Sequence, residues 1–316
     1  MRSAHKNFIA VLLSLFLIYF HYSDTPREQS SFTKVKATGQ EKKDDMTMDL
    51  LSLEQDDPQL VEYVKNNLLI KTGSSNGKDL NLTNFPPVIT GQYNQAVEVD
   101  KLFNSSLHQG FFIEAGGYDG ETFSNTLFFE LQRKWTGLLV EANSGLFQTL
   151  KGKNRNIWIS PGCLSLTSKP INTEFETNDY LGGIVGDEQD LALKSTEQKT
   201  CIPLYTLLLA LGNPTVHYFS LDIEGAELKV LKTIPWKLVD IWLVGIEACH
   251  MGDFDKTESR KDMIEFMEKQ GYKLIGTIGV DDIFIKPDKI SVTEDTIVYL
   301  KSLMIKEHFN IEDQNL

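Results

Sequence analysis

Short apolar runs alternate with stretches of helical periodicity from about Tyr93 to Ile285. Runs that are apolar almost throughout are typical of strands buried on both faces, as in a parallel sheet that helices cover on both sides. Helices are predicted in the intervening segments, where apolar residues recur three or four positions apart. The predicted strands are Phe111–Glu114, Gly137–Glu141, Asn156–Ser160, Val216–Asp222 and Ile241–Glu247.

Two further strands, Lys273–Thr277 and Asp282–Ile285, are close enough in sequence to form an antiparallel hairpin. The whole pattern predicts a doubly wound α/β fold, Rossmann-like, with a mostly parallel sheet closed by this hairpin. The stretch Ser165–Thr200 lacks the periodicity and is predicted to be an irregular insertion. The predicted helices are the stretch leading to Phe111, the one ending at Arg133, Ser144–Lys151, Tyr205–Leu211, the one from Ala226, and Lys261–Gln270.

The composition along the chain predicts four segments. Residues 1–22 form an apolar N-terminal segment, and residues 23–92 form a polar, charge-mixed stem with one short helix near Leu60–Leu69. Residues 93–290 hold the α/β domain, and residues 291–316 form a helical C-terminal tail.

The N-terminal segment contains an uncharged run, Phe8–Phe20, with Lys6 before it and Asp24 after it. Basic residues before an apolar segment favour a cytoplasmic N-terminus and a translocated remainder. A helix from Phe8 to Tyr22 would be about 22 Å long, which is short for a bilayer core of about 27–30 Å, so a cleaved signal peptide is the alternative. We expect a signal anchor and a single-pass type II membrane protein of the endoplasmic reticulum or Golgi, with the endosome and plasma membrane as further locations. Its C-terminal domain would then be lumenal.

Two features agree with entry into the secretory pathway. Asn81 and Asn104 each begin a glycosylation triplet. The three cysteines are too few for a disulfide scaffold, and their spacing does not resemble that of a metal site. In an oxidising lumen we expect one bridge, Cys163–Cys201, and a free thiol at Cys249, with three buried thiols as the alternative.

The net charge of -13, from 44 acidic and 31 basic residues, argues against a nucleic-acid partner, because no dense basic run offsets it. Acids instead follow the predicted strands. Ligands of doubly wound sheets bind outside the carboxyl ends of the strands, so these acids are candidate site residues. Alternatively, these acids cap the N-termini of the helices that follow the strands. The strand-end acids are Glu114, Glu141, Asp222 and Glu247.

A glycine-rich turn follows the first strand, with glycines at Gly116, Gly117 and Gly120. Glycines there let the backbone approach a ligand closely. Their spacing is not that of a dinucleotide-binding turn, although a nicotinamide enzyme is an alternative. An acid before the turn, Glu114, suits the ammonium and sulfonium groups of S-adenosylmethionine better than a pyrophosphate. Glu141, about twenty-five residues after the turn, suits a ribose.

Three stretches carry a specific resemblance: Phe112–Thr122 around the glycine turn, Gly137–Asn143, and Tyr218–Glu227, which reads YFSLDIEGAE. They resemble the FkbM-type methyltransferase family, and most of all its animal branch, the Star-like membrane proteins. The resemblance covers roughly residues 93–287 and implies a class I methyltransferase fold, an S-adenosylmethionine cofactor and type II membrane topology. The cofactor contacts that it implies are Glu114, Gly116, Asp119, Glu141 and Asp222.

Methyl transfer requires alignment and exclusion of water more than a strong catalytic group, but a hydroxyl acceptor benefits from a general base. His250 is the candidate base, with a plain loop histidine as the alternative. Glu224 and Glu227 are candidates for contacting the acceptor, or they begin a helix. We assign no metal ligands, and a divalent cation at this group of acids is the alternative reading.

Two functions follow from these features. The first is O-methyl transfer to a sugar or small-molecule acceptor in the secretory lumen. The second, which the Star-like resemblance implies, is a non-catalytic membrane protein that binds secretory cargo, such as growth-factor precursors, between the endoplasmic reticulum and the Golgi.

Overall fold

Parallel strands dominate the main sheet of the computed structural model, which describes residues 48–74, 79–177, 182–185, 195–309 and 313–315. These residues belong to a unit that begins at Asp44. Over the described residues the sheet has the order β1-β4-β3-β2-β8-β9-β11-β10. Its strands are β1 (Ile70–Lys71), β2 (Phe111–Ala115), β3 (Thr136–Glu141), β4 (Trp158–Pro161), β8 (Val216–Leu221), β9 (Ile241–Glu247), β10 (Lys273–Ile278) and β11 (Asp281–Ile285).

The strand directions match the sequence prediction. Strands β4, β3, β2, β8 and β9 run parallel to one another, and β10 and β11 close the sheet as an antiparallel hairpin. The order reverses between β2 and β8, because the chain builds outward from β2 to β4 and then returns to β8 on the other side. This reversal creates a switch point where ligands of doubly wound sheets bind.

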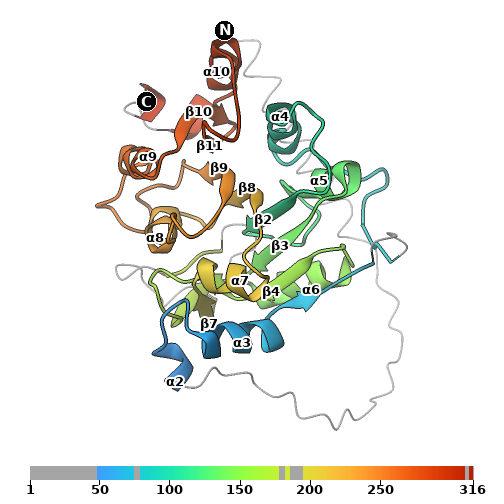
Figure 1. Ribbon diagram of the computed structural model, residues 1–316, viewed down its shortest axis with the longest axis vertical. Helices are drawn as coiled ribbons and strands as arrows, with labels where there is room; N and C mark the ends of the chain where they lie inside the picture. Colours follow the sequence, from blue (N-terminus) through green and yellow to red (C-terminus); the bar gives the residue numbers. More distant parts are fainter. Residues whose placement is uncertain (1–47, 75–78, 178–181, 186–194, 310–312, 316) are drawn as a thin grey trace. The chain divides into compact units, whose positions relative to one another are not determined.

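Alternate residues of the central strands enter two separate cores. On β8, Tyr218 packs in one core and Phe219 in the other; on β9, Leu243 and Val244 divide in the same way. This explains why the strands are apolar throughout: both faces are covered. Helices α8 and α9 lie on one side of the strands and α4, α5 and α6 on the other (Figure 1). The helices are α2 (Met48–Leu51), α3 (Pro58–Asn67), α4 (Gln95–Leu102), α5 (Leu127–Arg133), α6 (Ser144–Gly152), α7 (Leu204–Ala210), α8 (Glu227–Thr233), α9 (Arg260–Lys269) and α10 (Glu294–Lys301), with short 3-10 turns at Lys306–His308 and Asp313–Asn315.

Local capping fixes where several helices begin. Asn143 follows β3 directly, and its side chain accepts hydrogen bonds from the backbone of Gly145 and Leu146 at the start of α6. Ser259 and Asp262 form a reciprocal capping box at the start of α9. These caps satisfy backbone N–H groups that a helix terminus otherwise leaves free.

Part of the predicted stem is integrated into the fold. Within α3, Leu60 and Val64 are fully buried against α7, and the Thr206 hydroxyl of α7 donates to the Gln55 carbonyl oxygen at 2.7 Å. Strand β1 extends the sheet by pairing antiparallel with β4. The short helix predicted near Leu60–Leu69 within the stem is present as α3. Its apolar face packs against α7, so this part of the stem belongs to the folded unit. Towards the other end, the predicted C-terminal tail contains α10, which packs on β10.

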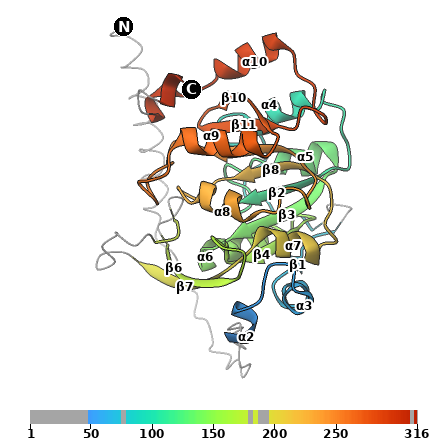
Figure 2. The same ribbon diagram turned by 60° about the vertical axis from the view of Figure 1, so that its left-hand side comes forward.

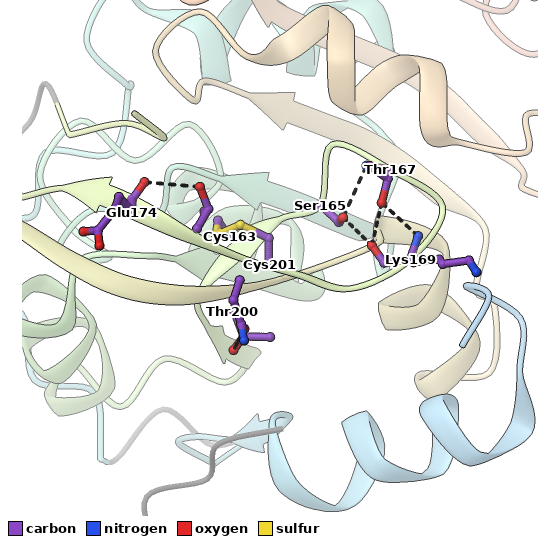
Figure 3. Close-up of a disulfide and its surroundings, with 9 residues drawn as sticks. Cys163, Ser165, Thr167, Lys169, Glu174, Thr200 and Cys201 are labelled. Atoms are coloured by element: carbon purple, nitrogen blue, oxygen red, sulfur yellow. Dashed lines mark hydrogen bonds between the residues drawn. A yellow bond between two sulfur atoms is a disulfide. The ribbon is translucent and has the colours of Figure 1, made fainter. Parts of the chain in front are cut away.

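The predicted irregular insertion instead contains a second sheet. Strands β5 (Cys163–Leu164), β7 (Thr196–Ile202) and β6 (Ile171–Glu176) lie in that order, and β6 pairs antiparallel with β7. The β6–β7 hairpin projects from the main sheet (Figure 2). Cys163 and Cys201 face each other across β5 and β7 and form the disulfide that the sequence predicts, with Cα atoms 4.2 Å apart (Figure 3). Cys249 is the free cysteine.

The membrane prediction requires correction. No helix in the described part of the chain is long and apolar enough to cross a bilayer. The predicted anchor, Phe8–Phe20, lies outside the described residues. The expectation of a single-pass type II membrane protein is therefore not upheld.

Candidate active site

A pocket lies at the switch point, at the carboxyl ends of β2, β3 and β8. The space between its walls, which opens to solvent, is about 440 Å³. The glycine turn, the end of β3, the start of β5 and the insertion supply its walls. The residues that line it are Ala115, Gly116, Val140, Glu141, Ala142, Gly162, Cys163, Leu164, Phe175, Gly182, Ile184, Asp222 and Ile223.

The glycine turn is held against both neighbouring strands. The backbone N–H groups of Gly116 and Gly117 donate to the Val140 carbonyl oxygen on β3, at 3.2 and 3.0 Å. Gly116 has a φ of +85°, and a Cβ there would lie 2.0 Å from the carbonyl oxygen of Asp222. A side chain at this position would push β2 and β8 apart, so glycine is required. Of the predicted turn glycines, Gly116 lines the pocket.

The other turn glycines serve packing. A Cβ on Gly120, whose φ is +78°, would lie 2.3 Å from Leu150 of α6, and a Cβ on Gly117 would lie 3.3 Å from Leu139. Asp119 accepts hydrogen bonds from the backbone N–H groups of Glu121 and Thr122 and from the Thr122 hydroxyl. The Asp119 carboxylate therefore shapes the turn.

Glu114, a predicted cofactor contact, has hydrogen-bond partners within the protein. Its carboxylate is buried and accepts hydrogen bonds from the hydroxyls of Ser124 and Thr126 and from the backbone of Asn125. A guanidinium nitrogen of Arg155, itself fully buried, lies 4.0 Å from it. Burial raises the pKa of Glu114, and Arg155 opposes that shift. Glu114 therefore holds the chain after the glycine turn, and it is not among the residues that line the pocket.

Glu141 faces the pocket, as the sequence predicts for its position. One carboxylate oxygen accepts the Tyr118 backbone N–H and the other accepts that of Asn143, both at 2.7 Å. Each oxygen keeps a lone pair for a ligand hydroxyl. Burial raises the pKa of Glu141 to about 7, with the two backbone donors and Lys199 acting in the opposite direction.

Acids gather where β8 and β9 end. Carboxylate oxygens of Asp222, Glu227 and Glu247 lie within 4.8 Å of one another, and Glu224 adjoins them in a loop with a φ of +60°. Burial raises the pKa of each of these groups, to about 8 for Glu224 and about 7 for Glu227, and the neighbouring carboxylates of the cluster add to the shift in Glu224, Glu227 and Glu247. One oxygen of Glu227 also accepts the backbone N–H groups of Ile223 and Gly225, so this acid shapes its own loop.

His250 lies beside this acid cluster. Its Nδ1 is 2.9 Å from a carboxylate oxygen of Asp253, and its Nε2 is 3.6 Å from Glu224 and 3.8 Å from Glu247. Asp253 therefore orients the ring and leaves Nε2 directed at the acids. Sequence reasoning missed Asp253, although the spacing of three residues from His250 across a turn was a usable signal.

The insertion, Ser165–Thr200, which the sequence suggests as a lid over the acceptor or part of a protein-binding face, forms an apolar wall of the pocket. Phe175 of β6 and Ile184 pack with Ala142 and with the Cys163–Cys201 disulfide. Gly183 lies close to Glu224, with 3.4 Å between its would-be Cβ and the Glu224 Cβ. The insertion therefore borders both the pocket and the acid cluster.

Comparison with known proteins gives a family and a fold. The profile of the Methyltransferase FkbM domain matches residues 114–274, just over half of the chain. A comparison with curated proteins gives no match. Among solved structures, precorrin-6y C5,15-methyltransferase from Geobacter metallireducens GS-15 is similar over 62% of this chain and 81% of its own, with 10% identity and a TM-score of 0.32. A chain of a fibrillarin/Nop5p complex is similar over 70% of this chain and 93% of its own, with 12% identity and a TM-score of 0.32.

The profile match spans the glycine turn, the pocket and the acids of β8 and β9. It implies a methyl-donor cofactor and agrees with the parallel sheet and closing hairpin, so the predicted Rossmann-like class I methyltransferase fold is confirmed. The chain belongs to the FkbM methyltransferase domain family.

Proposed function

We propose that this protein is an S-adenosylmethionine-dependent O-methyltransferase whose acceptor is a hydroxyl group of a sugar or another small molecule. The observation that carries the proposal is the pocket at the switch point. Gly116, Glu141 and Asp222 all line this pocket, and they come from the ends of the neighbouring strands β2, β3 and β8. A methyltransferase family, a pocket at the switch point and a nearby histidine base together favour transfer over simple binding.

The residues present fit S-adenosylmethionine. The two oxygens of Glu141 are held by backbone donors in a position to accept ribose hydroxyls. Next to Glu141, the side chains of Phe175 and Ile184 offer an apolar wall suited to the flat face of an adenine. Gly116 also lines the pocket. When bound, the cofactor supplies a methyl group on a sulfonium, which is attacked in line by a nucleophilic oxygen.

The remaining chemistry falls to residues of this chain. His250 accepts the proton of the acceptor hydroxyl at Nε2, while Asp253 holds Nδ1 and stabilises the charged ring. Glu224, 3.6 Å from Nε2, is placed to hold the acceptor by accepting a second hydroxyl hydrogen bond. Because the cluster is acidic, it disfavours phosphorylated acceptors and favours neutral ones.

The compartment proposed is oxidising, such as the secretory lumen. Its support is the Cys163–Cys201 disulfide, since such bonds persist mainly in oxidising compartments. Asn81 and Asn104 are both exposed, which leaves them accessible to glycosylation.

A second candidate is a non-catalytic module that binds secretory cargo, such as a growth-factor precursor, as the Star-like resemblance implies. The observation in its favour is that Glu114 and Asp119 form internal hydrogen bonds. Part of the family motif therefore supports the fold, and the motif would persist in a protein that has lost turnover.

Titration of S-adenosylmethionine into the full-length chain by calorimetry tests the proposal. We expect micromolar binding that weakens at least tenfold in Glu141→Ala, because a charge-assisted hydrogen bond contributes about 1.5–3 kcal/mol. Glu62→Gln, an exposed change on α3, is the matched control and should leave the affinity unchanged. A folded sample that shows no binding at millimolar cofactor would overturn the enzyme proposal and favour the cargo module.

A further inference from the structure

Three carboxylates lie close together near the ends of β8 and β9, and two of them have a buried oxygen without a hydrogen-bond partner among the described residues. Asp222, Glu227 and Glu247 each bring an oxygen to within 4.8 Å of the others. Glu227 is fully buried and Glu247 is 7% exposed. One oxygen of each, Oε2, is buried and accepts no hydrogen bond from any described residue.

No lysine or arginine among the described residues offsets this charge. None of the ion pairs there joins Asp222, Glu227 or Glu247 to a lysine or arginine; Glu247 has His250 nearby, with 3.8 Å between the ring Nε2 and the carboxylate. Burial and its acidic neighbours raise the pKa of Glu247 well above the ordinary value. Buried carboxylates in such a group require either shared protons or a cation. Unpaired buried oxygens are uncommon in folded proteins and require an explanation.

From this geometry we propose that Asp222, Glu227 and Glu247 form a binding site for a divalent cation. A set of three carboxylate oxygens suits magnesium and manganese better than it suits softer metal ions. Both orphaned oxygens are ligand atoms that a cation would satisfy directly. Glu227 is positioned for this by the backbone N–H groups of Ile223 and Gly225, which hold its other oxygen.

The site adjoins the pocket, because Asp222 belongs to both. On the basis of the proposed function, the cation binds an acceptor through two neighbouring oxygens, which selects vicinal diols among neutral small molecules. Coordination lowers the pKa of the bound hydroxyl. Its proton leaves oxygen for Nε2 of His250, which adjoins Glu247 and is not itself a ligand in this arrangement.

Manganese paramagnetic resonance on the full-length chain tests the site, because bound Mn²⁺ loses the sharp signal of the free ion. We expect one bound Mn²⁺ per chain, displaced by excess Mg²⁺, and a rise in melting temperature when the metal is added. Glu247→Gln and Asp222→Asn should each weaken Mn²⁺ binding at least tenfold. Glu265→Gln, an exposed acid of α9, is the control for loss of one charge and should bind Mn²⁺ like the parent.

The variants also require evidence of folding, which circular dichroism and retained S-adenosylmethionine binding by Glu247→Gln provide. Absence of Mn²⁺ binding and of any thermal shift in the parent protein would overturn the proposal, and so would equal binding by folded Glu247→Gln. Mn²⁺ bound at this site without any binding of S-adenosylmethionine would support the metal site while refuting the methyltransferase proposal, so the two failures are distinguishable.

Discussion

Gly116 lies so close to Asp222 that a Cβ on the glycine would come within 2.0 Å of the Asp222 carbonyl oxygen. This contact joins the ends of β2 and β8, the two strands between which the sheet order reverses. The backbone of one predicted motif therefore shapes the position of the acid in another.

Gly116→Ala should damage both the fold and the pocket. The overlap with Asp222 and the φ of +85° are expected to lower the free energy of unfolding by about 2–4 kcal/mol. Chemical denaturation measures this, and calorimetry should show loss of S-adenosylmethionine binding. Gly152→Ala is the matched control, because a Cβ there meets no atom within 4 Å. Equal stability of both variants would contradict the close approach.

Glu114→Gln should separate a structural acid from a ligand-binding one. Its carboxylate accepts bonds from Ser124, Asn125 and Thr126, so the change should cost about 1.5–3 kcal/mol of stability. Below the melting temperature, affinity for S-adenosylmethionine should stay within about twofold of the parent. A large loss of affinity with unchanged stability would show that Glu114 contacts the cofactor after all.

Affinity for S-adenosylmethionine should increase with pH because of Glu141. Its pKa in the folded protein is about 7, above the ordinary value of 4.5. Between pH 4.5 and about pH 7, the Glu141 carboxyl is ionised in the unfolded chain and protonated in the folded protein. The contribution of Glu141 to the free energy of unfolding therefore falls as the pH rises towards 7. A ribose that requires the ionised carboxylate displaces the proton, so affinity should fall about tenfold per pH unit below 7.

Calorimetry from pH 5.5 to 8.5 measures this dependence. Glu141→Gln should bind more weakly at high pH and lose this contribution to the pH dependence, since the amide does not titrate. The same slope in parent and variant would assign the dependence to another group.

Removing the disulfide should affect the pocket as well as stability. Cys163 and Cys201 are separated by 38 residues, and a crosslink of that span stabilises by about 4 kcal/mol in the chain-entropy treatment. Because Cys163 lines the pocket, the double variant Cys163→Ala/Cys201→Ala should also bind S-adenosylmethionine more weakly. Thermal unfolding with and without reductant measures the first effect, and the double variant should be insensitive to reductant.

An unchanged melting temperature in the reduced parent protein would contradict the disulfide's contribution to stability. If the double variant were less stable but bound S-adenosylmethionine as tightly as the parent, the disulfide would contribute to stability and not to cofactor binding.

The sequence by itself determined the central sheet and the location of the site. Apolar runs such as Val216–Leu221 identify strands buried on both faces, because that property is local to each strand. Parallel strands also end at one edge, so acids that follow them converge wherever the strands are ordered in the sheet. Glu141 and Asp222 could therefore be assigned to one pocket without coordinates.

Only the tertiary structure decided which acid does what. Glu114 and Glu141 both follow an apolar run in the sequence, but in the sheet Glu114 pairs with Leu139, two residues before Glu141. The loop at Ser124 and the distant Arg155 enclose Glu114, whereas Glu141 lines the pocket. Such enclosure depends on contacts between residues far apart in sequence. The same holds for the β6–β7 hairpin, since polar strands pair through backbone hydrogen bonds that leave little hydrophobic pattern.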